Sequence, residues 1–216
     1  MSGFAAIFAI VSAILILALP RRWAPLPFLI GICYMTLGQG IALGPFNFTV
    51  IRLLILAGAA RLLIRGEFTS IGFNTMDRIA IAWAVWTLFS SYFHAEPREA
   101  LIFRMGVTFN ALGVYFLFRS FIKSQEDAVR VAVMAAIVLI PVAAEMLSEK
   151  ATGRNAFALL GGVPPEVVER NGKLRAQGPF AHPILAGTVG AVCLPFIVGL
   201  WASHRKIAIA GITACV

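Results

Sequence analysis

Residues 175–187 read Arg175-Ala-Gln-Gly-Pro-Phe-Ala-His-Pro-Ile-Leu-Ala-Gly187, and they join a long polar segment to an apolar one. Gly178-Pro179 is a turn signal, and Pro183 suits the first turn of a helix, where its missing N–H is not needed. The stretch therefore predicts a loop that ends at the mouth of a helix, beside His182. With Arg175 nearby, this arrangement would suit a phosphate or a carboxylate. The same residues also suit a loop in which His182 only caps the helix and Arg175 meets lipid head groups.

The composition around this stretch is that of a membrane protein. Of the 216 residues, 60% are hydrophobic and only 13% are charged, whereas about a quarter of a soluble domain is charged. The formal charge of +8 comes from basic residues at the ends of apolar runs, where they set orientation and meet anionic lipid. The chain lacks the aromatic and basic pattern of base stacking, so we expect no nucleic-acid partner.

Apolar runs of about 20 residues, the length of a spanning helix, recur along the chain. The predicted fold class is all-α: a polytopic transmembrane helical bundle of about seven spans plus the start of an eighth, with one extramembrane loop. The predicted spans are Gly3–Leu19, Pro25–Leu43, Thr49–Ile64, Ile79–Phe93, Leu101–Ile122, Ala128–Leu147 and Pro183–Trp201. Residues 1–147 hold spans 1–6, residues 148–181 form a periplasmic loop, and residues 182–216 hold span 7 and a truncated span 8.

The ends of these segments carry further signals. Asn171-Gly172 within Glu166–Gln177 predicts a short β-hairpin in the long loop, because both positions tolerate positive φ. Gly40-Ile-Ala-Leu-Gly44 is a GxxxG pattern that favours close helix packing. Ile207–Val216 is too short to span, so we expect the N-terminal part of a longer protein, with a natural stop at Val216 as the alternative.

Cysteine and histidine give no sign of a metal site. The cysteines lie in apolar runs without paired spacing, which is typical of buried thiols. The histidines are far apart in sequence and form no HExxH pattern. These residues are Cys33, Cys193 and Cys215, and His94, His182 and His204. We expect neither a metal nor a cofactor.

Three charges fall inside the predicted spans: Arg52, Arg104 and Glu145. Basic residues are concentrated at the odd-numbered connectors, which places those connectors in the cytoplasm and the N-terminus outside. All three charges then lie near the outer face, with Arg175 and His182. The sequence predicts an outward-facing basic pocket for a diphosphate or other polyanionic head group, with Glu145 orienting one arginine. The alternatives are side chains that snorkel to lipid head groups or a purely structural pair.

Three stretches carry a family resemblance: Thr152-Gly-Arg-Asn155, Gly161-Gly-Val-Pro164 and Arg175–Gly187. With Leu37-Gly-Gln-Gly-Ile41, Phe46–Thr49 and Arg52, the chain resembles the O-antigen ligase and polymerase family of bacterial polytopic membrane proteins. The resemblance implies an inverting glycosyltransferase of about a dozen spans that needs no metal. Its members transfer glycan from an undecaprenyl diphosphate carrier on the periplasmic face.

By position, Arg175 matches the arginine that opens the family motif, and the resemblance implies that it holds the diphosphate. The family's acceptor-activating histidine belongs to a later periplasmic loop, so no catalytic residue is assigned here and His182 does not take that role. Arg52 and Arg104 are candidates for binding the diphosphate only because of their place in the predicted spans, and the resemblance does not assign them.

The resemblance implies a location in the bacterial inner membrane, with the functional face in the periplasm. The expected partners are a lipid-linked glycan, membrane lipids and other membrane proteins of polysaccharide assembly. Two other functions stay open. A transporter or flippase would line a path through both leaflets with charges, and a non-catalytic assembly subunit would need none of the transfer chemistry.

Overall fold

The computed structural model describes residues 1–36, 38–67 and 72–216. Leu37, in the stretch 37–41 that carries part of the resemblance, lies outside the described residues. So do residues 68–71 of the polar connector predicted over Gly66–Asp77.

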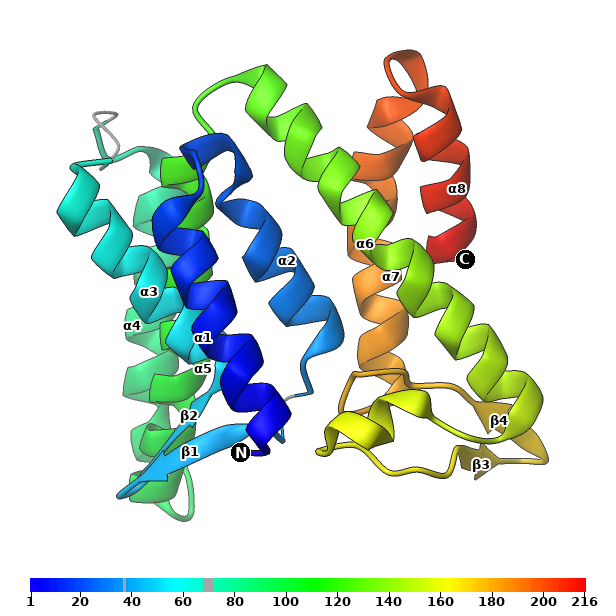
Figure 1. Cartoon of the computed structure of the whole chain (residues 1–216). Coiled ribbons are helices and arrows are strands. Elements are labelled where there is room, and N and C mark those ends of the chain that lie inside the picture. Colours follow the sequence, from blue (N-terminus) through cyan, green and yellow to red (C-terminus); the bar gives the residue numbers. More distant parts are fainter. Residues whose placement is uncertain (37, 68–71) are drawn as a thin grey trace.

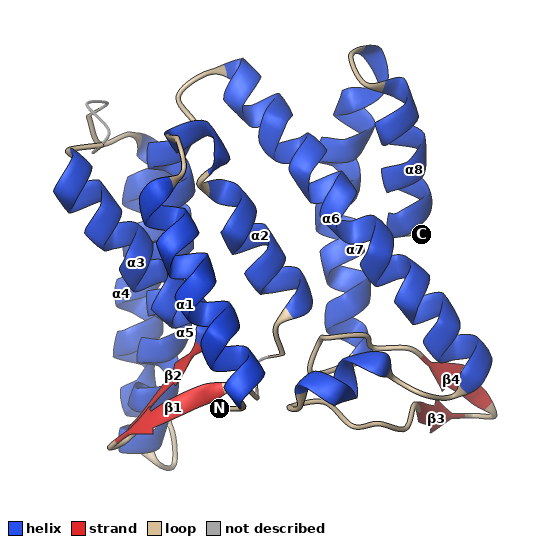
Figure 2. Cartoon of the chain, in the orientation of Figure 1, coloured by secondary structure: helices blue, strands red, loops and turns tan. Residues whose placement is uncertain are grey.

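Helices dominate the described chain, with two short antiparallel strand pairs between them (Figures 1 and 2). The α-helices are α1 (Gly3–Ala18), α2 (Pro25–Tyr34), α3 (Val50–Arg65), α4 (Thr75–Phe89), α5 (Pro97–Phe121), α6 (Gln125–Thr152), α7 (Pro183–Val198) and α8 (Arg205–Cys215). The strands are β1 (Gly40–Leu43), β2 (Phe46–Thr49), β3 (Val168–Arg170) and β4 (Lys173–Arg175). Short 3-10 helices are η1 (Arg21–Trp23), η2 (Ser90–Phe93), η3 (Ala156–Leu160) and η4 (Gly199–Ala202).

The prediction of seven or more spans is wrong. The structure is 73% helical, but only three of the described helices are long and apolar enough to cross a membrane: Pro97–Phe121, Gln125–Thr152 and Pro183–Ala202. The apolar helix α1 has 16 residues, which at 1.5 Å per residue gives about 24 Å, against the ~30 Å of a bilayer core. The three long helices indicate a membrane protein.

The second predicted span, Pro25–Leu43, shows why the span count fails. Helix α2 ends at Tyr34, and residues Gly40–Leu43 form β1, paired with β2 from Gly40↔Thr49 to Leu43↔Phe46. The predicted GxxxG helix surface is therefore a strand. Glycine is a poor helix former, and the polar groups of this segment have partners elsewhere. Thr36 Oγ1 donates to Gly161 O (2.5 Å) and Gln39 Nε2 donates to Leu160 O (2.8 Å).

Two cores lie on either side of α2. One buried cluster joins α1, α3 and α5 with Phe28 of α2, around side chains such as Leu54 and Phe121. The other joins α6, α7 and α8 around Ala136, Ile197 and Leu200, and α2 contributes Cys33 to it. Figure 1 shows α2 between the two groups, and the Tyr34 hydroxyl donates to Val138 O of α6 at 3.0 Å.

Both strand pairs lie at one end of the molecule, which we call the hairpin end (Figures 1 and 2). Helices α5 and α7 begin there and α6 ends there. The connectors α1–α2, α5–α6 and α7–α8 lie at the opposite end, where α3 also ends and α4 begins. Large apolar side chains on the outer faces of α1 and α4 are exposed, including Ile7, Ile14, Trp83 and Trp86. An exposed apolar surface of this kind suits contact with lipid.

Candidate functional site

The β3–β4 hairpin is present where Asn171-Gly172 predicts it. Asn171 has φ 56° and Gly172 has φ 70°, the left-handed values that a tight two-residue turn needs at both positions. The register pairs Arg170 with Lys173 and Val168 with Arg175. Like charges directly opposite each other destabilise a strand pair, so the Arg170–Lys173 pairing does not add to the stability of the hairpin.

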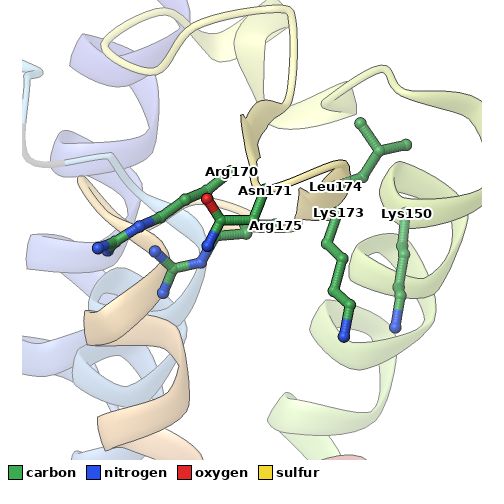
Figure 3. A pocket seen from close by; sticks show the side chains of 6 residues that line it. All are labelled: Lys150, Arg170, Asn171, Lys173, Leu174 and Arg175. Atoms are coloured by element: carbon green, nitrogen blue, oxygen red, sulfur yellow. The ribbon is translucent and has the colours of Figure 1, made fainter.

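These strands form one wall of an open pocket of about 650 Å³ (Figure 3). Its lining residues are Lys150 from α6 and Arg170, Asn171, Lys173, Leu174 and Arg175 from the hairpin. In Figure 3 the Lys150 and Lys173 side chains extend in the same direction, and Arg170 and Arg175 extend together on the other side. Among the ion pairs of the described residues, none involves any of these four cations. We call Lys150, Arg170, Lys173 and Arg175 the basic pocket.

An apolar cavity adjoins the basic pocket through a shared residue, Lys150. This cavity has a volume of about 270 Å³ and lies between α6, α7 and the end of α8. Its walls include Leu139, Met146, Phe180 and Val189. A cationic surface next to an apolar cavity fits a molecule with an anionic head and an apolar tail.

Helix α6 anchors the loop that carries the hairpin through Glu149, which is 0% exposed. The Glu149 carboxylate accepts backbone N–H bonds from Gln177 (3.1 and 3.2 Å) and Gly178 (2.7 Å). Asn155 Nδ2 donates to Gly178 O at 2.8 Å. The Gln177–Gly178 turn is thus held from both sides, two residues after Arg175.

Glu145, predicted to orient an arginine, instead contacts the loop backbone. Its Oε1 accepts the N–H of Ala156 at 2.8 Å, and its Oε2 is buried without a hydrogen-bond partner among the described residues. Because Glu145 lies one turn before Glu149 on α6, both carboxylates face the same loop.

His182 caps α7, as the simpler interpretation of the motif expects. It occupies the N-cap position, and its Nδ1 accepts the N–H of Ile184 at 3.2 Å. The side chain is exposed, and it does not line the basic pocket.

Arg52 and Arg104 lie at the hairpin end but contact different neighbours. Arg52 Nε donates to Asn110 Oδ1 (3.3 Å), and its Nη1 donates to Asn47 O. Arg104 Nη1 donates to Thr87 O (3.0 Å) and to the Ser90 hydroxyl.

The Arg104 contacts place a cation at the C-terminal end of α4, where it is favoured. Arg104 Nη2 also lies 2.6 Å from His94 Nε2.

The structure therefore places all five candidate residues, Arg52, Arg104, Glu145, Arg175 and His182, at one end of the molecule but does not bring them into one pocket. Only Arg175 lines the basic pocket.

Sequence reasoning missed Lys150, Arg170 and Lys173 as site residues. The hairpin prediction itself nevertheless implied that residues 170 and 173 would face each other. Glu149 had no local signal, since its partners lie 28 and 29 residues away along the chain.

The chain matches no protein-family model, no curated protein and no solved structure.

Proposed function

We propose that this membrane protein binds the diphosphate head group of a lipid-linked glycan in the basic pocket. The proposed role is in glycan transfer from an undecaprenyl diphosphate carrier during surface polysaccharide synthesis. The resemblance of Arg175–Gly187 to the O-antigen ligase and polymerase motif supports this choice of ligand. The proposal assigns binding, not catalysis, to the residues described.

The observation that carries the proposal is the pairing of the basic pocket with the apolar cavity at Lys150. Four cations gather without an ion-pair partner among the described residues, and two of them face each other across the hairpin. A diphosphate would relieve this repulsion with charge-assisted hydrogen bonds. The apolar cavity would take the first part of the lipid chain.

The distribution of basic residues supports a periplasmic position for the pocket. Ten of the 18 basic residues lie at the opposite end, and they are Arg21, Arg22, Arg61, Arg65, Arg78, Arg119, Lys123, Arg130, Arg205 and Lys206. Five of the other eight belong to the loop 148–181, and a loop of this length counts toward orientation, so these five offset part of the difference. The opposite end would then face the cytoplasm of a bacterial inner membrane, and the basic pocket the periplasm.

The test is a binding measurement on the whole chain in lipid nanodiscs. Farnesyl diphosphate serves as the probe, with farnesyl monophosphate and farnesol as comparisons. We expect the diphosphate to bind most tightly and Arg175→Ala to weaken it roughly tenfold to a hundredfold, the value of a hydrogen bond to a charged group. Arg98→Ala is the matched control, because Arg98 is exposed at the same end and does not line the basic pocket.

Equal affinity of Arg175→Ala and the unchanged protein for farnesyl diphosphate would refute the binding site. For the transfer reaction, Arg175→Ala in the producing cell should abolish the surface glycan while leaving membrane insertion intact. If binding is lost but the glycan persists, the basic pocket is not needed for the transfer, and a non-catalytic accessory subunit is favoured instead.

A further inference from the structure

Glu149 is a buried carboxylate that makes no ion pair with the residues that the structure describes. It is 0% exposed, and its hydrogen bonds come from the backbone of Gln177 and Gly178. Burying a carboxylate is costly unless it is well hydrogen-bonded, and the Glu149 carboxylate meets this condition only through the N–H groups of the Gln177–Gly178 turn.

Glu149 connects the two walls of the basic pocket. The next residue along α6, Lys150, forms one wall, and Arg175, two residues before Gln177, forms the other. Gly178 has φ +57°, a left-handed value that suits glycine. A Cβ added there would lie 3.0 Å from Met146 Cγ, so the turn packs closely on α6.

We infer that Glu149 is a positioning residue, which holds Arg175 at the correct separation from Lys150 through its hydrogen bonds to Gln177 and Gly178. This inference rests on the proposed function and deepens it. The carboxylate does not touch the diphosphate; it sets the geometry of the cations that do.

Loss of the Glu149 charge and loss of its hydrogen bonds should have opposite effects on the affinity of the basic pocket for an anion. Removing a negative charge near a cluster of cations should strengthen the binding of an anion by Coulomb's law. Loss of the backbone anchor should weaken it, because Arg175 then moves relative to Lys150. Glu149→Gln is nearly isosteric, removes the charge and keeps one carbonyl acceptor, so it separates the two effects.

The experiment measures farnesyl diphosphate affinity in nanodiscs for Glu149→Gln, Arg175→Ala and the double variant. We expect Glu149→Gln to weaken binding about tenfold, within the range of coupling between neighbouring sites. The same change should have little effect in the Arg175→Ala background, because Glu149 acts through Arg175. Glu145→Gln is the control, since Glu145 lies on the same helix and binds the N–H of Ala156, not the Gln177–Gly178 turn.

Each outcome has one meaning. Unchanged or tighter binding by Glu149→Gln, with Arg175→Ala still weakened, overturns the positioning role alone. Equal effects of Glu149→Gln with and without Arg175 also overturn it. Unchanged binding by Arg175→Ala refutes the proposed function itself. If Glu149→Gln does not fold, Glu149→Asp, which keeps the charge but shortens the reach, must weaken binding in the same Arg175-dependent way.

Discussion

Single buried charges in this protein are held by several partners, and Arg61 is the clearest case. Its side chain is fully buried. Nη1 donates to the carbonyl oxygens of Ile16 (2.5 Å) and Leu19 (2.6 Å), while Nε and Nη2 donate to the Glu67 carboxylate at 2.7 and 2.8 Å. The guanidinium therefore fastens α3 to the C-terminal end of α1, where a cation is favoured. Three other ion pairs of the described residues, Arg21–Asp127, Arg130–Asp127 and Arg119–Asp77, occur at the same end.

The Arg61–Glu67 pair should make stability depend on pH. Hydrogen bonding from Arg61 lowers the pKa of Glu67 below its ordinary value, against the opposite effect of burial. A folded-state pKa below the unfolded one means that the stabilisation is present above about pH 4.3, the pKa of free Glu. It is lost as pH falls through the folded-state pKa.

We expect Glu67→Gln to lower the free energy of unfolding by about 1–3 kcal/mol at pH 7, because Arg61 loses its charged partner. The difference from the unchanged protein should shrink as pH falls below about 4.3, because the unfolded chain then binds the proton first, and it should disappear below the lowered folded-state pKa. Thermal unfolding in detergent across pH measures both effects. Glu126→Gln is the control, since Glu126 is exposed and makes no ion pair within the described chain. A pH-independent difference would contradict the assignment.

At the scale of elements, the β3–β4 hairpin combines a favourable turn with an unfavourable charge pair. Asn171-Gly172 suits the turn, but Arg170 and Lys173 face each other across it. Sequence arrangements that reduce stability are expected at functional sites. The hairpin should therefore be less stable alone than its turn residues suggest.

Arg170→Glu should improve the hairpin and harm the basic pocket. An opposite-charge pair with Lys173 should stabilise the strands by about 0.2–1 kcal/mol, while farnesyl diphosphate should bind at least tenfold more weakly because an acid then faces the anion. Hydrogen exchange of the hairpin amides and the nanodisc binding assay measure the two effects. Weaker protection together with unchanged binding would show that the charge pair has no functional role.

At the scale of the whole molecule, the three long helices alternate in direction. Helix α5 runs from the hairpin end to the opposite end, α6 returns, and α7 runs from the hairpin end to the opposite end again (Figure 1). If these helices cross a bilayer, the connector at residues 122–124 and the loop at 153–182 lie on opposite sides of it. The proposed orientation puts the loop outside.

Membrane-impermeant labelling of single cysteines tests this orientation. In a background with Cys33, Cys193 and Cys215 replaced by Ala, we expect Asn171→Cys to react in intact cells and Lys123→Cys to react only after permeabilisation. Both positions are exposed, so burial would not explain a failure to react. Reaction of both positions from one side would contradict a bundle in which α6 spans the membrane.

The sequence by itself determined the features that depend on neighbouring residues. The apolar composition indicates a membrane protein, Asn171-Gly172 makes a turn, and Pro183 after His182 starts α7. Each of these features depends on the backbone preference of neighbouring residues or on the total apolar content. Both properties can be read directly from the order of residues along the chain.

Only the tertiary structure decided the rest. Residues 35–43 are apolar enough to suggest a helix. Yet α2 ends at Tyr34 and Gly40–Leu43 form a strand, while Thr36 and Gln39 bind backbone carbonyls more than 120 residues away. Glu149 is buried and Lys150, its neighbour, is exposed in the basic pocket, although nothing in their order separates the two roles. Contacts between distant segments leave no periodic pattern in the sequence, so the number of spans and the shape of the pocket emerge only when the chain has folded.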